Sequence, residues 1–227
     1  SPFSTVNNAV GPAVNGDTII IVGTITQTGT VNINESLTFT TKIGETATII
    51  GNDAGSGSGR MYNTNVLGVN IEFNNITFKG STNATGVGAV MNFNSNGSLT
   101  FNKCNFINNS TIGSGIGGGA LNIANAATVV VAGCVFDTNT STNVGGAINI
   151  SGASSLTATD SFFINNNAAT KGGAIFSAGA GASLDLTRVT FYNNYADDAS
   201  TGGGGAIWIT NGVHTITNGT FFNNTIQ

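Results

Sequence analysis

Carboxylate side chains are the residues of this chain that would carry hydrolytic chemistry, because paired acids protonate and activate in glycoside hydrolysis. The sequence has ten of them, spread along its whole length. Only Asp197 and Asp198 are adjacent, in a stretch expected to form a long turn. Together with turn carbonyls they are candidate calcium ligands, with a solvated loop as the alternative. The scatter of the acids predicts no catalytic residue and no cofactor.

The two cysteines could form a covalent cross-link. Cys104 and Cys134 each stand two residues before a phenylalanine, Phe106 and Phe136. Equivalent positions on neighbouring parallel strands lie about 4.8 Å apart, which is within the Cα range of a disulfide. An extracellular location favours oxidation, whereas the flat geometry of parallel strands does not favour the bond. A disulfide and two stacked buried thiols both remain open.

Asparagines that begin Asn-x-Ser/Thr are candidate glycosylation sites, although chance produces most of them in a chain this rich in Asn and Thr. Asn83 and Asn96 are expected to be exposed and are the candidates. Asn109 and Asn139 belong to an internal repeat and are expected to face inward.

Two short motifs recur and define the elements that carry these residues. The first is Gly-Gly-Ala-apolar, at residues 118–121, 145–148, 172–175 and 204–207, with a degenerate copy at 87–90. The second is Phe-x-x-Asn, at residues 106–109, 136–139, 163–166, 191–194 and 221–224, with an imperfect copy at 78–81. A fixed period, here about 27–32 residues, is the signature of a solenoid.

Each repeat predicts three short strands and no helix. Apolar residues seven and five positions before each motif phenylalanine alternate with polar ones, as in a strand with one buried face. The Gly-Gly-Ala segment and the segment that ends in the phenylalanine supply the other two strands. Such a unit cannot bury its inner face alone, so stacked repeats form three parallel sheets. We therefore predict an all-β fold, a right-handed single-stranded parallel β-helix of about eight three-strand coils.

The repeated side chains are expected to stack in columns along this solenoid. The phenylalanine rings form one internal column with a spacing of about 4.8 Å, and the motif asparagines form a hydrogen-bonded ladder. Most variation in repeat length falls in one turn. Its two long versions, Asn108–Gly118 and Asn193–Gly204, are expected to bulge from one edge.

The same alignment assigns structural roles to two further titratable features. Asp160 falls one coil below Arg188, which predicts an exposed ion pair worth about 0–1 kcal/mol. His214, the only histidine, falls in a column of aliphatic residues and is expected to be half covered in the terminal coil.

The chain is expected to form one domain over residues 1–227. A short amphipathic helix from Ser4 to Ala13, N-capped by Ser4 and ended by Gly11 and Pro12, is expected to cover the first coil. The successive parts are residues 1–15 (cap), 16–65 (atypical first coils) and 66–227 (repeats).

Composition excludes several classes of function. Only 7% of the residues are charged and the net charge is −4, so the chain has no basic stripe for nucleic acid. No apolar run approaches the ~20 residues that span a bilayer, and we expect no membrane insertion. The sequence begins at Ser1-Pro2-Phe3, as a secreted chain does after removal of its signal peptide. An extracellular or cell-surface location is expected.

The paired Gly-Gly-Ala-(Ile/Leu/Val) and Phe-x-x-Asn motifs resemble the repeats of chlamydial polymorphic outer-membrane proteins and of β-helical adhesin-like proteins of bacteria and methanogenic archaea. The segment from Gly16 to Ile21 looks like the first coil of the pectate-lyase-like superfamily. The resemblance covers about residues 15–227. It implies a β-helical surface protein, with a polysaccharide lyase or hydrolase as the least favoured alternative, because the acids form no cluster.

Two non-enzymatic functions remain. The primary prediction is a subunit of an extracellular fibre, assembled head to tail from copies of this chain. The sequence ends within a repeat motif, so Phe221, Phe222 and Ile226 are expected to contact Pro2 and Phe3 of the next copy. The alternative is an adhesin or stalk whose long turns and neutral faces bind cell-surface glycans or proteins.

Overall fold

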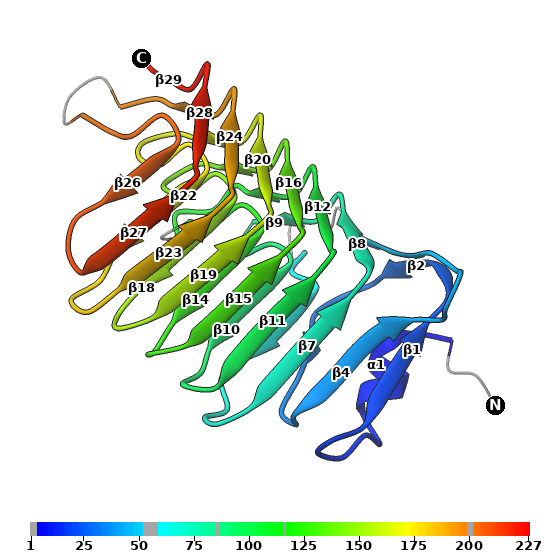
Figure 1. Ribbon diagram of the computed structural model, residues 1–227. Coiled ribbons are helices and arrows are strands. Elements are labelled where there is room, and N and C mark those ends of the chain that lie inside the picture. Colours follow the sequence, from blue (N-terminus) through cyan, green and yellow to red (C-terminus); the bar gives the residue numbers. More distant parts are fainter. Residues whose placement is uncertain (1–3, 52–58, 85–86, 116, 199–201) are drawn as a thin grey trace.

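The chain winds into a parallel β-helix, in which successive strands stack along one axis (Figure 1). The computed structural model describes residues 4–51, 59–84, 87–115, 117–198 and 202–227. Strand order within each sheet follows the chain, so that each turn of the solenoid, here called a coil, adds one strand to a sheet. The predicted all-β parallel β-helix is confirmed, with about seven complete coils and an incomplete eighth.

Four parallel sheets, named A to D, run along the molecule. Sheet A contains β1 (Thr18–Ile21), β4 (Leu37–Thr41), β7 (Asn70–Asn74), β11 (Ser98–Asn102), β15 (Thr128–Ala132), β19 (Ser155–Thr159), β23 (Ser183–Thr187) and β27 (Val213–Thr217). Sheet B contains β2 (Gly23–Gln27), β5 (Ala47–Gly51), β8 (Ile76–Lys79), β12 (Asn105–Ile107), β16 (Val135–Asp137), β20 (Phe162–Ile164), β24 (Thr190–Tyr192) and β28 (Thr220–Phe222). Sheet C contains β3 (Val31–Asn32), β6 (Tyr62–Thr64), β10 (Met91–Asn94), β14 (Leu121–Ala124), β18 (Ile148–Ser151), β22 (Ile175–Ala178) and β26 (Ile207–Ile209). Sheet D contains β9 (Thr82–Asn83), β13 (Ser110–Thr111), β17 (Thr140–Ser141), β21 (Asn167–Ala168), β25 (Tyr195–Ala196) and β29 (Thr225–Ile226).

Most coils have four strands instead of the predicted three, and the additional strand belongs to sheet D. The three expected strands of each repeat correspond to sheets C, A and B. Directly after the motif asparagine, the chain forms one more two-residue strand, such as β17 after Asn139. Two residues are too few to show the alternation that identifies a strand in a sequence.

Single residues with a left-handed backbone turn the chain at two corners of most coils. Between sheets A and B these residues are Asn75, Lys103, Gly133, Asp160, Arg188 and Asn218. Between sheets B and D they are Gly80, Asn108, Thr138, Asn165, Asn193 and Asn223. Asparagine and glycine adopt this conformation most readily, which explains their recurrence here.

The motif phenylalanines form the predicted internal column. Phe136 and Phe163 stack at 4.7 Å between ring centroids, with their planes 3° apart. The column continues from Phe78 to Phe221. A second column, formed by Phe39, Phe73 and Phe101, packs edge-on against it. These rings, which fill the N-terminal half of the core, are buried.

The Gly-Gly-Ala motif is required where the turn after sheet D passes close to its neighbours. Gly145 has a φ of +60°, and a Cβ there would lie 2.3 Å from the carbonyl oxygen of Ile148. A Cβ on Gly146 would lie 2.1 Å from the carbonyl oxygen of Gly173 in the next coil. The following alanine, Ala147, is buried.

The N-terminal helix is shorter than predicted. α1 covers Val6–Val10, and its N-cap is Thr5, whose hydroxyl accepts a hydrogen bond from the Asn8 N–H at 3.1 Å. Ser4 was therefore the wrong cap, because the helix begins one residue later than the amphipathic pattern indicated. Gly11 ends the helix as expected, and Val6 joins the hydrophobic core.

The two long turns are only partly described. Residue 116 of the first and residues 199–201 of the second lie outside the described residues. Their expected bulge stays a prediction.

Candidate interaction surfaces

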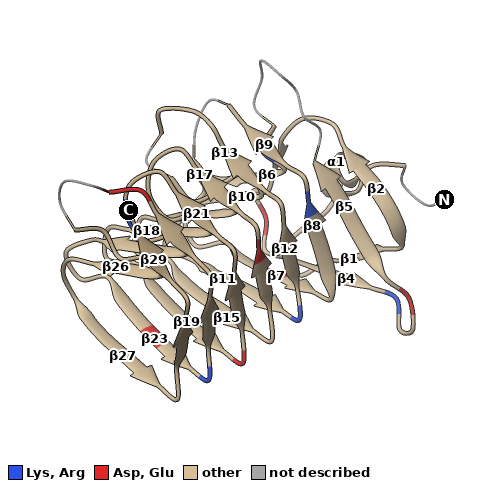
Figure 2. Cartoon of the chain, turned by 90° about the horizontal axis from the view of Figure 1, so that it is seen from above, with Lys and Arg blue, Asp and Glu red and all other residues tan. Residues whose placement is uncertain are grey.

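Charged residues are few and scattered, several of them at the tips of turns (Figure 2). Among the described residues, no three His, Cys, Asp or Glu side chains form a group that could hold a metal ion. Asp197 is exposed, whereas the Asp198 carboxylate lies 3.9 Å from the Lys171 ammonium. That ammonium also lies 4.6 Å from the Trp208 ring centroid. Asp198 is thus an ion-pair partner of Lys171, and the calcium site stays an untested prediction.

Asp160 and Arg188 form the expected ion pair between coils. The guanidinium donates two hydrogen bonds to the carboxylate, at 2.6 and 2.8 Å, and both side chains are more than half exposed. The hydrogen bonds from Arg188 lower the pKa of Asp160 below its ordinary value. An exposed pair of this kind contributes little to stability.

His214 is half-buried in the terminal coil, as predicted. Its Nδ1 accepts a hydrogen bond from the Leu184 N–H at 3.2 Å, and its Nε2 lies 2.8 Å from the Asn211 carbonyl oxygen. Because the first contact requires an acceptor, the proton lies on Nε2. Both ring nitrogens are engaged by backbone groups, so the imidazole has a structural role here.

Cys104 and Cys134 lie in one internal column on neighbouring coils and are both buried free thiols. The Cys104 N–H donates to Cys134 Sγ at 3.3 Å, and the Cys104 thiol lies 3.3 Å from the Phe73 carbonyl oxygen. Burial raises the pKa of Cys104 well above its ordinary value, which keeps this thiol protonated. The structure holds the two side chains as stacked thiols, and the disulfide stays a prediction.

The motif asparagines form the predicted inner ladder. Asn139 donates from its N–H and from Nδ2 to Asn166 Oδ1, at 3.0 Å each, and Nδ2 also donates to the Phe106 carbonyl oxygen. The same three bonds recur at Asn109, Asn166 and Asn194. The N–H and one Nδ2–H of each of these asparagines therefore point toward the next coil, and the other Nδ2–H bonds back to the preceding coil.

The two candidate glycosylation sites differ in exposure. Asn96 is exposed, as expected, and its Oδ1 accepts a hydrogen bond from the Gly68 N–H. The expectation that Asn83 is exposed was wrong. It lies in sheet D, directly before a turn, with its side chain facing the core and fully buried. Glycosylation itself stays a prediction for Asn96 alone.

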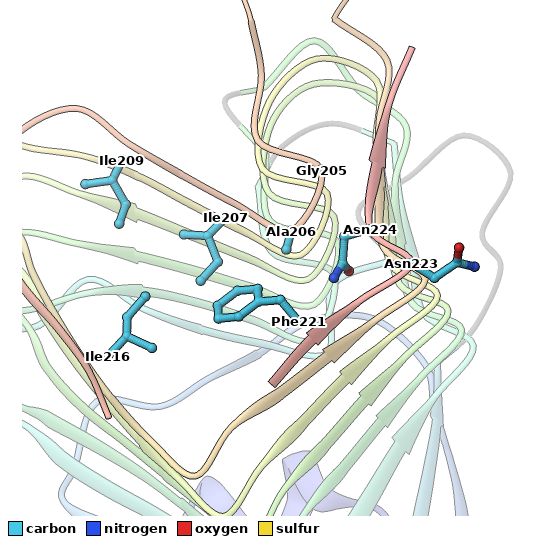
Figure 3. Close-up of a pocket in the computed structure, with 8 residues that line it drawn as sticks. All are labelled: Gly205, Ala206, Ile207, Ile209, Ile216, Phe221, Asn223 and Asn224. Carbon is cyan, nitrogen blue, oxygen red and sulfur yellow. The ribbon is translucent and has the colours of Figure 1, made fainter. Parts of the chain in front are cut away.

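The C-terminal coil surrounds a hollow of about 530 Å³, lined by apolar side chains together with Asn223 and Asn224. Phe221, Ile207 and Ile216 point into it from sheets B, C and A (Figure 3). Phe221 is the outermost ring of the inner phenylalanine column and is 47% exposed. This coil thus presents core side chains to solvent.

The inner ladder is also open at this coil. Asn224 accepts the two bonds from Asn194 and donates from Nδ2 to the Phe191 carbonyl oxygen. Among the described residues, Asn224 does not make the onward bonds from N–H and Nδ2 that each earlier ladder asparagine makes.

The predicted assembly residues separate into different surfaces. Phe221 lines the hollow, whereas Phe222 faces outward on sheet B and stacks on Tyr192, with 5.7 Å between ring centroids. Ile226 is 48% exposed in β29. Pro2 and Phe3 lie outside the described residues.

At the N-terminal end, a second hollow of about 570 Å³ lies between α1 and the strands β1 and β2. Val6 and Ala9 line it from the helix, and Ile19, Ile21 and Ile25 from the strands. The helix therefore leaves apolar surface beside the outer edges of sheets A and B.

The sequence reasoning missed the outward-facing aromatic side chains. Phe162 and Tyr192 point outward from β20 and β24 and are 46% and 40% exposed. On sheet C, Phe176 and Trp208 stack at 4.7 Å. The signal was present, because each of these aromatics stands one residue away from a motif phenylalanine or a motif isoleucine.

Two segments of the chain, residues 160–178 and 188–210, match the Chlamydia polymorphic membrane protein repeat. Each contains one Phe-x-x-Asn and one Gly-Gly-Ala-Ile motif. None of the curated proteins compared with the chain matches it. The repeat match and the fold confirm the resemblance to chlamydial polymorphic membrane proteins. The chain is a β-helical repeat protein similar to them.

This class of repeat indicates a surface-exposed protein of the outer-membrane type. In the part of the chain that the structure describes, no helix has the length and apolar character needed to cross a bilayer.

Proposed function

We propose that this chain is a non-enzymatic structural protein of the cell surface whose solenoids associate head to tail into a fibre. The observation that supports the proposal is the makeup of the coil of residues 202–227, in which Asn224 and the hollow beside it present the groups with which each inner coil binds the next. Together they offer donors and apolar surface to an added coil, which is what each inner coil offers to the next.

The N-terminal end of the solenoid also presents strand edges and apolar side chains. Among the described strands, β1 and β2 are the outermost at that end of sheets A and B, as β27 and β28 are at the C-terminal end. Apolar side chains, among them Ile19 and Ile25, line the hollow behind them. Contact between two different ends of one molecule is heterologous and repeats without closing, which produces a filament.

Sedimentation velocity tests this assembly. Wild-type protein is expected to form species that grow with concentration, and Ile216→Asp to remain monomeric, because it places a charge in the hollow. Val213→Asp is the matched control, since this residue lies in the same strand, is 79% exposed and does not line the hollow. If the wild type is monomeric, or if the two variants associate to the same extent, the hollow does not bind a second copy of the chain.

The absence of catalysis is part of the proposal. The ion pairs of Asp160 and Asp198 and the engaged ring of His214 support structural roles for these groups.

Adhesion is a second candidate function, favoured by the exposed aromatics of sheet B. An adhesin of this kind would keep them accessible on the side of the solenoid. Beads coated with wild-type chain would then attach to a cell layer, and beads coated with Tyr192→Ala would attach less.

A further inference from the structure

Two columns of inward-facing side chains run through every strand of sheets A and B. In sheet A, one column begins at Ile19 and reaches Ile216, and every residue between them is apolar. In sheet B, the motif column extends from Ile25 to Phe221 and is apolar throughout. The first and last members of each column therefore hold the same inward position of a coil. A coil added in the same register at either end would continue both columns.

The hollow at the N-terminal end runs along the outer backbone edge of β1. Its lining includes all five residues from 18 to 22. Because side chains alternate between the two faces of a strand, consecutive residues can line one hollow only along the strand's edge. On the opposite edge of β1, the Thr38 N–H donates to the Asp17 carbonyl oxygen at 3.0 Å. Alternate residues in a parallel sheet direct their backbone groups to opposite neighbours, so those of Thr18 and Ile20 face the hollow.

The shape of this hollow suits an extended strand. It has a strand edge on one side and the apolar side chains of α1 on the other, and an added strand can form hydrogen bonds along such an edge. The strand β27 of a second copy fits, because it lies at the opposite end of the same sheet. Repeating the register of sheet A places its Ile216 beside Ile19. The same step places His214 beside Asp17, so the carboxylate meets an imidazole instead of another acid.

We propose that β27 of one copy enters the hollow between α1 and β1 of the next copy. Sheets A and B then continue across the contact, with Ile216 on Ile19 and Phe221 on Ile25. The helix α1 contacts β3 and precedes β1 in the chain, as each strand of sheet C precedes a strand of sheet A. It therefore lies on the sheet C side of the contact, where it enters the hollow that Ile207 of the other copy lines (Figure 3). The inference rests on the proposed head-to-tail assembly and gives it a register.

Engineered cysteines on the outward face of sheet A test this register. In the proposed contact, Thr217 of one copy lies beside Ile20 of the next, with Cα atoms about 4.8 Å apart. Purified Ile20→Cys and Thr217→Cys proteins are mixed and treated with a short bifunctional thiol reagent. A covalent dimer is expected on denaturing gels of the mixture and of neither variant alone. The native Cys104 and Cys134 are buried and do not compete.

Val213→Cys is the matched control for Thr217→Cys. Residue 213 lies on the same face of β27 and is exposed, but it stands about 13 Å further along the strand. Its mixture with Ile20→Cys is expected to give about tenfold less dimer, since a short reagent does not span that distance. Circular dichroism melts that match the wild type show that the three variants are folded.

The outcomes separate the register from the assembly itself. If wild-type protein associates in sedimentation velocity but the two mixtures cross-link equally, the register is wrong and head-to-tail assembly stands. Dimers of Ile20→Cys alone would show that two N-terminal ends meet, which also overturns the register. If the wild type is monomeric and neither mixture cross-links, the proposed assembly fails as well, and the hollow beside β1 does not bind a second copy of the chain.

Discussion

At the scale of single residues, neighbouring phenylalanines in β20 have opposite environments. Phe163 is fully buried between Phe136 and Phe191 in the inner column, whereas Phe162 is 46% exposed on the outer face. We expect Phe163→Ala to lower the free energy of unfolding by about 3–5 kcal/mol, because it leaves a cavity in a stacked column. Phe162→Ala is the matched control, expected to cost below about 1 kcal/mol. Urea melts measure both, and equal losses would contradict the burial pattern.

At Tyr62, in contrast to Phe163, a substitution is expected to leave stability unchanged or to increase it. Its ring is buried among Phe39, Phe73 and Phe78, and its hydroxyl has no hydrogen-bond partner among the residues that the structure describes. An unpaired buried hydroxyl costs about 1–3 kcal/mol. Tyr62→Phe is therefore expected to leave the thermal midpoint unchanged or raise it. A clear drop in calorimetry would show that the hydroxyl is bonded.

At the scale of elements, the ladder of motif asparagines joins each coil to the next. Asn166→Ala removes the acceptor of the Asn139 N–H and Nδ2 donors and leaves the Phe136 carbonyl oxygen without its Nδ2 partner. The expected cost is about 3 kcal/mol or more, since each unpaired buried group costs about 1–3 kcal/mol. Asn165→Gly is the control, because glycine tolerates its φ of +55° and the side chain is exposed. Similar midpoints for the two variants in denaturant melts would contradict the ladder's role.

The repeats allowed the fold and its internal columns to be predicted, because side chains that stack at a fixed period leave a period in the sequence. Asp160 and Arg188 were paired for the same reason. Sheet D and the N-cap at Thr5 were not found, since a two-residue strand and a five-residue helix have too few positions to show a pattern. The burial of Asn83 was missed because its repeat is imperfect.

The repeat pattern predicted only some of the interaction surfaces. The exposed terminal coil followed from the repeat. The outward aromatics of sheet B did not, because Phe162 and Tyr192 stand at different positions of their repeats and leave no period in the sequence.

At the scale of the whole molecule, Asp160, Asp198 and His214 are engaged in structural contacts. We expect incubation of the protein with polygalacturonate to release no reducing ends or unsaturated products above the buffer control. Asp197→Asn and Asp198→Asn should leave that baseline unchanged. Product release that either substitution abolishes would place a catalytic site in the long turn.

The hydrogen bonds that join the coils have a mechanical consequence. Strands run around the solenoid, and the bonds between parallel strands lie across them, along the long axis. Tension applied to the two ends therefore loads one coil at a time, and the outermost coil peels away before its neighbour is strained. Successive ladder asparagines such as Asn166 and Asn194 are 28 residues apart, so each detached coil would release roughly 95 Å of chain. A surface protein of this design loses one coil at a time under tension, so it dissipates the applied force gradually instead of unfolding in one event.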